Sequence, residues 1–354
     1  MTGGDRIRRV RALVNPSLDV AAVPAPSTDA IAFHAGLADY RPTPLRDLAP
    51  VAAELGLAAV AVKDESDRLG LPAFKVLGAS WAVERALRER PEVHTLVTAS
   101  AGNHGRAVAH VAALRGLSCR ILLPARSAPA RREAIAAEGA EVVVTAGTYE
   151  EAVAVAAEEG ERPGTMALAD VGDSGPAHWA IDGYHTLFTE TAAQGEFDLI
   201  LVPVGGGSLA AAAARHGADA GIPVVGVEPD TAACLTASLA AGRLTAVANP
   251  GTSMAGLDCA EISTTAWPSL RAGIAGMVTV SDAEAHAAMR ELAGAGLVIG
   301  DCGAATLAGL RALATEAACS ALRTAVGLGT GSRVLLIATE GATDPEAYRA
   351  TVAG

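Results

Sequence analysis

The sequence contains few aromatic residues: Phe, Trp and Tyr make up 3% of the 354 residues, although 51% of the residues are hydrophobic. The core must therefore be filled by small aliphatic side chains, as where helices pack closely on a buried sheet. A chain of this length is long for one average domain and comfortable for two.

Positive charge is also scarce, and the formal net charge is -12. We therefore expect neither nucleic acid nor an anionic membrane surface as a general partner, although a local basic pocket for a phosphate is compatible with this charge. No apolar run reaches the length of a membrane span. The first residues turn polar at Asn15 and Pro16, before an apolar signal-peptide core could form. The sequence predicts a soluble protein.

Clustered cysteines are absent as well. Five cysteines are scattered along the chain without a CxxC pair or a His–Cys cluster, at Cys119, Cys234, Cys259, Cys302 and Cys319. This pattern is typical of reduced thiols in a cytoplasmic protein, and it indicates neither a metal site nor a disulfide framework.

Short apolar runs alternate with alanine-rich amphipathic segments from about residue 95 onward. The runs that predict strands are 94–100, 119–124, 141–146, 198–204, 223–229 and 333–339. The segments that predict helices are 105–116, 130–139, 149–160 and 208–217. Strand–helix alternation with short connections predicts a three-layer α/β protein with a parallel sheet covered on both faces.

One lysine stands out in the stretch GLPAFKVLGAS, residues 70–80, where Lys75 follows Phe74 and precedes a helix-like run. It could be a lysine near a helix N-terminus whose ammonium reaches water. It could also be an amine held in a partly dry pocket, neutral often enough to condense with an aldehyde. The stretch alone does not decide between these interpretations.

A glycine loop follows a strand-like run in VPVGGGSLAAAA, residues 202–213. Gly205, Gly206 and Gly207 let several backbone N–H groups converge, and Ser208 begins a helix whose N-terminus carries positive partial charge. Such a loop can bind a phosphate, but it is not a Walker loop and lacks dinucleotide-binding spacing. Glycines also join strands to helices for steric reasons alone.

A second small-residue loop lies in VTASAGNHGRAVA, residues 97–109. Ser100, Asn103 and His104 could cap the helix that follows. The loop could equally hold the carboxylate of a ligand against backbone N–H groups, with Asn103 near another oxygen of that ligand.

Taken together, these stretches resemble the fold-type II pyridoxal-phosphate enzymes, the group of threonine dehydratase and the tryptophan synthase β chain. Within that group the chain resembles the diaminopropionate ammonia-lyases most. The stretches that carry this resemblance are TPL at 43–45, KDESDRLGLPAFKVLGAS at 63–80, GNHGR at 102–106, SMAGLDCAE at 253–261 and LLIATEGATDPEAY at 335–348. The resemblance covers most of the chain.

The resemblance implies pyridoxal phosphate as cofactor, and no residues are assigned to a metal ion. Lys75, beside Phe74, would form the Schiff base with the cofactor and act as acid and base on one face. Asn103 would hydrogen-bond the 3′-oxygen, and Thr339 would face the pyridine nitrogen, where a hydroxyl suits elimination. The cofactor phosphate would be held by Gly205, Gly206, Gly207 and Ser208.

The resemblance also implies where a small amino-acid substrate would bind. Its contacts would come from Ser100, Ala101, Gly102 and His104. Asp170, in MALAD at 166–170, would face the substrate and, directly or through a water, supply an acid; it could instead cap the next segment.

Two positions depart from the pattern of the ammonia-lyases. Ala101 stands where they have an aspartate thought to remove the α-proton of the D-isomer, and Asp301 stands where a glutamate is usual. A methyl group cannot accept a proton, so the chemistry could survive for L-substrates alone; alternatively, the change could mark a different substrate.

The expected reaction is β-elimination of ammonia from 2,3-diaminopropionate, giving pyruvate and ammonia. A lyase acting on serine, threonine or an O-activated serine is an alternative, and so is a regulatory subunit that binds the cofactor without catalysis. By analogy with the group, residues 88–177 would form a small domain and residues 1–87 plus 178–354 a large one, with the site between them and a homodimer as the assembly.

Overall fold

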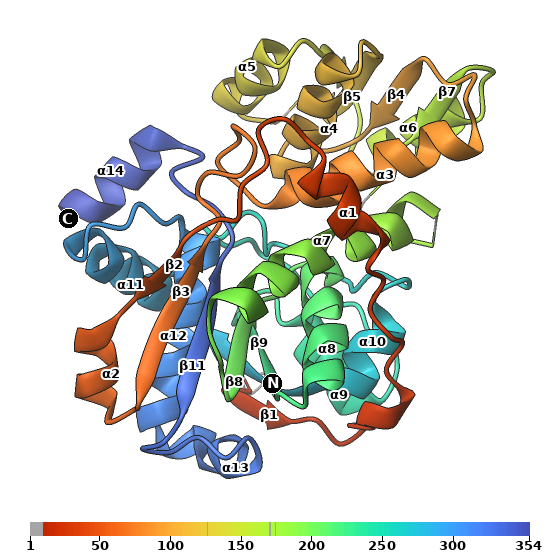
Figure 1. Ribbon diagram of the computed structural model, residues 1–354. Coiled ribbons are helices and arrows are strands. Elements are labelled where there is room, and N and C mark those ends of the chain that lie inside the picture. The colour runs from red at the N-terminus through yellow and green to blue at the C-terminus, as the bar shows by residue number, and fades with distance from the viewer. Residues whose placement is uncertain (1–9, 126, 170, 174) are drawn as a thin grey trace, which may run out of the picture.

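Two separate β-sheets organise the chain, as Figure 1 shows. The computed structural model describes residues 10–125, 127–169, 171–173 and 175–354. The larger sheet has the strand order β1-β10-β9-β8-β11-β3-β2, and the smaller one β6-β5-β4-β7. In chain order the strands are β1 (Ala12–Val14), β2 (Leu45–Asp47), β3 (Ala59–Asp64), β4 (Thr95–Thr98), β5 (Ser118–Pro124), β6 (Glu141–Thr145), β7 (Thr165–Ala167), β8 (Leu199–Pro203), β9 (Val224–Pro229), β10 (Ile274–Val280) and β11 (Arg333–Ala338).

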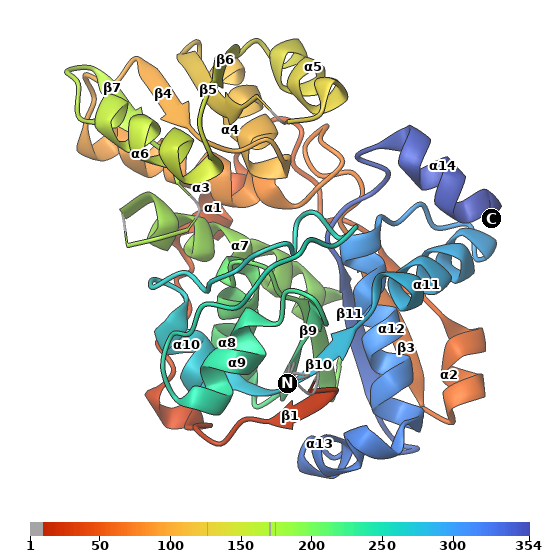
Figure 2. The same ribbon diagram turned by 180° about the vertical axis from the view of Figure 1, so that it is seen from behind.

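Helices cover both faces of the larger sheet, which Figures 1 and 2 show from opposite sides. One apolar core lies between this sheet and α2, α11 and α12, and a second lies between the other face and α7, α8 and α10. The elements of this part, apart from α3, are α1 (Asp29–Ala35), α2 (Ala49–Leu55), α7 (Gly175–Gln194), α8 (Ser208–Ala220), α9 (Cys234–Ala241), α10 (Trp267–Gly273), α11 (Asp282–Gly294), α12 (Asp301–Thr315), α13 (Ser320–Ala325), α14 (Pro345–Ala353) and the 3-10 turns η1 (Val20–Ala22) and η2 (Ala317–Cys319).

The smaller sheet is also covered on both faces. Its main core lies against α4 (Asn103–Leu114), α5 (Pro129–Ala137) and α3 (Lys75–Glu89), and a smaller core lies beneath α6 (Tyr149–Gly160). The three-layer α/β arrangement expected from the sequence is therefore present in each part. The predicted small domain, residues 88–177, contains the whole smaller sheet; its exact limits stay a prediction.

The larger sheet is not wholly parallel, which corrects the expectation of a parallel sheet. Its five central strands run parallel, whereas β1 pairs antiparallel with β10 and β2 pairs antiparallel with β3. Both edge strands are three residues long and none of their residues is buried. Such short, partly exposed strands carry no apolar run or alternation that could reveal them in the sequence.

The central strand β3 was missed for a different reason. It ends in Lys63 and Asp64, which in a sequence indicate a solvated position, yet both side chains are buried. The Lys63 ammonium is ion-paired with Glu190 of α7 at 2.8 Å, so a charge that looks exposed belongs to the core. Among the described helices, none is long and apolar enough to cross a bilayer.

The helix α3 joins the two parts of the molecule. Leu77 packs into the core of the larger part, whereas Val76 and Trp81 pack into that of the smaller part. Its crossing with α7 is tight: a Cβ on Gly183 would lie 2.6 Å from the carbonyl oxygen of Leu77. This contact fixes the first turn of α3, which begins at Lys75.

The substitution Gly183→Ala should therefore push α3 away from α7 and lower the stability of the protein by about 1–3 kcal/mol, as overpacking usually does. Chemical denaturation of the protein measures this. Gly294→Ala is the matched control, because nothing lies within 4 Å of the position of its Cβ. Equal stabilities of the two variants would show that α3 and α7 can move apart without loss of stability.

Candidate active site

The side chain of Lys75 lies beside two aromatic rings. It is the first residue of α3, and its Nζ is 5.2 Å from the ring centroid of Phe74 and 5.7 Å from that of Tyr184. The two rings are tilted against each other, 4.8 Å between centroids. Lys75 is partly buried, so its amine is held against an apolar wall. The second interpretation of Lys75, an amine that condenses with an aldehyde, stays a prediction.

The segment before Lys75 is fastened to the end of β11. The N–H of Phe74 donates to the carbonyl oxygen of Thr339 at 3.1 Å, and Ala73 forms an isolated bridge with Glu340. The hydroxyl of Thr339 is buried and has no hydrogen-bond partner among the residues that the structure describes. A buried polar group without a partner is costly, so this hydroxyl is suited to receive a ligand.

Asn103 reaches the same place from the smaller part. It begins α4, directly after the loop that follows β4, and its Nδ2 donates to Oε2 of Glu340 at 2.6 Å. Lys75, Asn103 and Thr339 are thus brought together through contacts at the carboxyl end of β11.

The other predicted substrate contacts lie in the loop before Asn103. Ser100 Oγ accepts a hydrogen bond from Gly102 N–H at 3.4 Å, and Ala101 packs against the core of the smaller part. His104 is buried, with its Nε2 2.8 Å from the carbonyl oxygen of Leu168. This contact holds the Asn103 loop against the end of β7. The substrate role of these residues stays a prediction.

The glycine loop joins β8 to α8 and is closely packed. A Cβ on Gly205 would collide with the carbonyl oxygen of Gly256, and Gly207 has a positive φ of 96° that disfavours other residues. The loop leads directly into the N-terminus of α8, whose first N–H groups have no partner within the helix. The geometry is that of an anion-binding loop.

The segment around Asp170 runs past this glycine loop. Asp170 itself lies outside the described residues. Its neighbour Val171 lies near Gly206, and the N–H of Gly172 donates to Ser263 Oγ at 3.0 Å. Ser263 in turn donates its N–H to the carbonyl oxygen of Gly206 at 3.0 Å.

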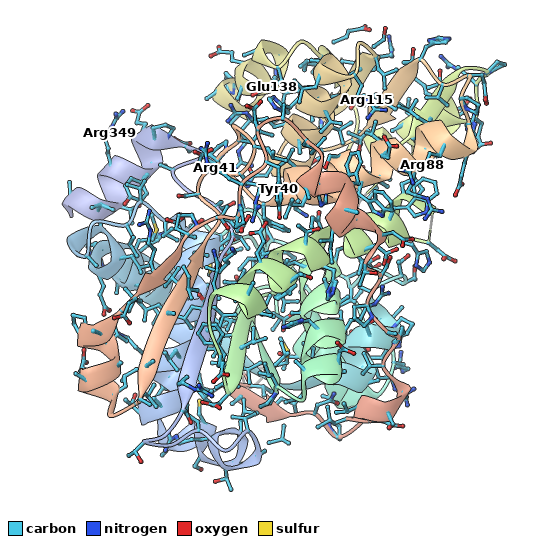
Figure 3. All side chains as sticks on the ribbon, in the orientation of Figure 1. Tyr40, Arg41, Arg88, Arg115, Glu138 and Arg349 are labelled. Carbon is cyan, nitrogen blue, oxygen red and sulfur yellow. The ribbon has the colours of Figure 1, made fainter. Side chains whose placement is uncertain are left out.

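The structure also contains a group of buried charges, which we name the buried ionic network: Lys63, Glu65, Arg68 and Glu190. Arg68 donates to Glu65 at 2.6 Å and to Glu190 at 2.6 Å, and Lys63 donates to Glu190 at 2.8 Å. Tyr40, at the junction of the two parts in Figure 3, donates its hydroxyl to Glu190 at 2.7 Å.

The charged groups of this network shift one another's pKa values. Burial alone would raise the pKa of Glu190, but the hydrogen bonds and charges of Arg68 and Lys63 hold that pKa below its usual value. Burial lowers the pKa of Lys63, against the opposing effect of Glu190. Arg68 also exchanges two backbone hydrogen bonds with Leu71, so the network fixes the loop that leads to Lys75.

The sequence contains two lysines, Lys63 and Lys75. Lys63 is fully buried and donates to Glu190, to the carbonyl oxygen of Thr43 and to Gln194. Its amine is therefore committed to the network. Lys75, the other lysine, is partly buried beside Phe74 and Tyr184, and its bond to the cofactor stays a prediction.

These features fit pyridoxal phosphate. A lysine amine lies beside two aromatic rings, a buried hydroxyl has no partner within the described part of the chain, and a glycine loop precedes a helix N-terminus. They correspond to the aldehyde, the pyridine nitrogen and the phosphate of that cofactor.

Comparison with known proteins agrees. The family described as pyridoxal-phosphate dependent enzyme matches residues 37–339. The chain belongs to this family, which confirms the family resemblance and the cofactor expected from the sequence.

Within this family, the chain is similar to diaminopropionate ammonia-lyases over most of its length. The chain is 32% identical to the diaminopropionate ammonia-lyase of Escherichia coli K12, over 90% of this chain and 89% of that protein. The enzyme of Salmonella typhimurium LT2 is 32% identical over 90% of both. The crystal structure of the E. coli enzyme with an aminoacrylate-PLP azomethine reaction intermediate has a TM-score of 0.88 at 31% identity and covers 96% of each chain. This likeness confirms the expected α/β fold-type II architecture.

The sequence analysis missed several residues that the structure brings to the site. Glu340 directly follows Thr339, and a charged residue straight after an apolar strand was the available signal. Tyr184 lies on α7, far along the chain, and only the α3–α7 crossing brings it to Lys75. Glu65 and Arg68 lie within the stretch 63–80, which carries part of the family resemblance, but the pairing of Arg68 with Glu190 depends on the fold.

Removing the charge of Glu190 should leave Lys63 and Arg68 buried with too little negative charge. Glu190→Gln is expected to cost about 3–5 kcal/mol of stability, as breaking a buried ion pair does. Denaturant unfolding of the cofactor-free protein measures it. Glu196→Gln is the control: its partner is Arg333 and its side chain is 83% exposed, so its cost should stay below about 1 kcal/mol. Similar costs for both variants would contradict a structural role of the network.

Proposed function

We propose that the protein is a pyridoxal-phosphate-dependent ammonia-lyase that converts 2,3-diaminopropionate, the L-isomer in particular, to pyruvate and ammonia. The observation that carries this proposal is the nearly end-to-end match with diaminopropionate ammonia-lyases. The match with the biosynthetic threonine dehydratase of E. coli K12 is 31% identical but covers 71% of this chain and 48% of that protein.

The proposal assigns the following residues to the cofactor. Lys75 binds its aldehyde carbon, Phe74 lies beside that amine, and Asn103 donates to its 3′-oxygen. The hydroxyl of Thr339, without a partner in the part of the chain that the structure describes, would donate to the pyridine nitrogen. The phosphate lies on the glycine loop, Gly205, Gly206 and Gly207, with Ser208 at the start of α8.

The chain's own groups then move the protons. When bound, the cofactor supplies an electron sink for the charge that develops at the α-carbon. Lys75, beside the rings of Phe74 and Tyr184, removes the α-proton. An amine leaves poorly unless it is protonated, so Asp170 or a water that it holds delivers a proton to the β-amino group. One water per substrate completes the reaction, giving one pyruvate and two ammonia.

The substrate's carboxylate would bind at the loop of Ser100, Ala101 and Gly102, close to the N-terminus of α4. His104 supports this loop from beneath through Leu168. The protein would act in the cytoplasm as a homodimer, with a small amino acid as its substrate.

A lyase for serine or threonine is the second candidate, supported by the threonine dehydratase relatives. The two candidates differ in stoichiometry, because diaminopropionate alone gives two ammonia per 2-oxo acid. Assays of 2-oxo acid and ammonia on L-diaminopropionate, L-serine and L-threonine therefore separate them. A cofactor-loaded protein inactive on every substrate would favour a regulatory subunit.

Replacing the proposed catalytic lysine should abolish turnover. We expect Lys75→Ala to reduce 2-oxo acid formation to background, because both the bond to the cofactor and the α-proton acceptor are lost. Borohydride reduction of the loaded wild-type protein, followed by peptide mapping, should place the cofactor on Lys75 and leave Lys63 unlabelled. Appreciable turnover by Lys75→Ala, or label on Lys63, would contradict the assignment of Lys75 as the lysine that binds the cofactor.

The methyl group of Ala101 should restrict the enzyme to L-diaminopropionate. Ala101→Asp would place a carboxylate in the loop, and turnover of the D-isomer should rise about 10²-fold, the lower end for a general base. Ala101→Asn is the matched control, similar in size but unable to accept the proton. If the wild type already uses both isomers equally well, another residue supplies the second base.

A further inference from the structure

Glu340 is a buried carboxylate between the two parts of the site. It follows Thr339 at the carboxyl end of β11, and its side chain is buried. The Nδ2 of Asn103, at the start of α4, donates to its Oε2 at 2.6 Å. A hydrogen bond to a carboxylate at this distance is short and stronger than one between neutral groups. Glu340 therefore links the larger part directly to the loop of the smaller part.

The backbone of Glu340 is fixed from two sides. Its carbonyl oxygen accepts the N–H of Gly300 at 3.0 Å, just before α12. Glu340 also bridges to Ala73, and the N–H of Gly341 donates to the carbonyl oxygen of Pro72 at 3.0 Å. The bridge partner, Ala73, is two residues before Lys75. Asn103 is thus positioned relative to the segment that carries Lys75.

The side chain of Glu340 also faces the start of α12. Donor atoms of Asp301, Cys302 and Glu340 lie within 4.8 Å of one another. Burial raises the pKa of Glu340, and the nearby Asp301 adds to that effect, whereas hydrogen bonds from Cys302 and Asn103 oppose it. Although these are metal-ligating groups, an N–H of Asn103 points at the Glu340 carboxylate, and an N–H is a partner for an acceptor rather than for a cation.

The amide of Asn103 has two N–H donors in one plane. With one hydrogen given to Glu340, the plane of the amide is fixed and the second hydrogen has a defined direction. Without that acceptor the amide could rotate about its last torsion, which is broad for Asn.

We propose that Glu340 is a positioning residue that orients the amide of Asn103 toward the 3′-oxygen of the bound cofactor. The inference rests on the cofactor role proposed above for Asn103, but not on the identity of the amino-acid substrate. Glu340 acts through Asn103 and does not itself touch the cofactor.

Two substitutions test this. Glu340→Gln keeps an acceptor of the same shape without the charge, and Glu340→Leu removes the acceptor. Cofactor affinity, measured by titrating cofactor-free protein, and the visible absorption band of the bound cofactor are the readouts. We expect Glu340→Leu to weaken cofactor binding about tenfold, the equivalent of one hydrogen bond, and to shift the band. Glu340→Gln should retain most of both properties.

A double-mutant cycle with Asn103→Ala separates positioning from a general loss of structure. If Glu340 acts through Asn103, neither Glu340 variant should weaken cofactor binding further in the Asn103→Ala background. If Glu340→Leu does not fold, Glu340→Ala, which also removes the acceptor, takes its place in the cycle. Fully additive effects, or wild-type affinity and absorption in Glu340→Leu, would overturn the proposal.

Glu159→Gln is the control for neutralising a buried glutamate. Glu159 lies on α6 and accepts from Arg120 at 3.0 Å, so its loss should lower stability without moving the absorption band. The readouts do not depend on turnover. A non-additive cycle in a protein inactive on diaminopropionate would support the positioning role while rejecting the proposed substrate, and an additive cycle in an active lyase would do the reverse.

Discussion

The position of Lys75 depends on a group of charges that are hidden from water. The chain between β3 and α3 forms no strand or helix, and backbone hydrogen bonds to the end of β11 and the residues after it fix only its two ends, at Glu65 and at 72–74. Arg68 takes over this task by binding Glu65 and Glu190 with its side chain and Leu71 with its backbone. Because α7 contributes Glu190 and also crosses α3 closely at Gly183, one helix fixes both the loop before the lysine and the turn that carries it.

The site residues stand where parallel strands end and helices begin. Thr339 follows β11, the glycine loop follows β8, and the Asn103 loop follows β4 of the other sheet. In α/β proteins, ligands bind outside the carboxyl ends of the strands, where helix N-termini offer free N–H groups. Here Lys75, Asn103 and Ser208 each begin a helix. A phosphorylated cofactor and a substrate carboxylate, both anionic, suit such a place in a protein whose overall charge is negative.

The sequence revealed the apolar strands β8, β9 and β11 but missed β10, which is equally buried. The runs at β8, β9 and β11 are buried on both faces and read as continuous hydrophobic stretches, and the motifs at their ends predicted the loops of the site. The sequence could not reveal β3, because Lys63 is buried by a partner more than a hundred residues away. Tyr184 and Glu340 escaped notice for the same reason. The contact of Tyr184 with Lys75 arises where α3 crosses α7, and that of Glu340 with Asn103 arises where α4 meets the end of β11; the charge of Glu340 after an apolar strand was the one local signal.

Both groups of buried charge, the ionic network and Glu340, hold site residues in position; they are not the cheapest way to stabilise the fold. An apolar cluster of the same volume would often make a protein equally or more stable, because taking charges out of water is costly. An apolar contact, however, is non-directional and tolerates sliding, whereas a carboxylate accepting a guanidinium or amide N–H fixes both distance and angle. Cofactor chemistry demands that kind of accuracy, since small displacements of reacting groups reduce rates strongly. The ionic network thus fixes the loop before Lys75, and Glu340 orients the amide of Asn103. The bridge between Glu340 and Ala73 connects these two parts of the site.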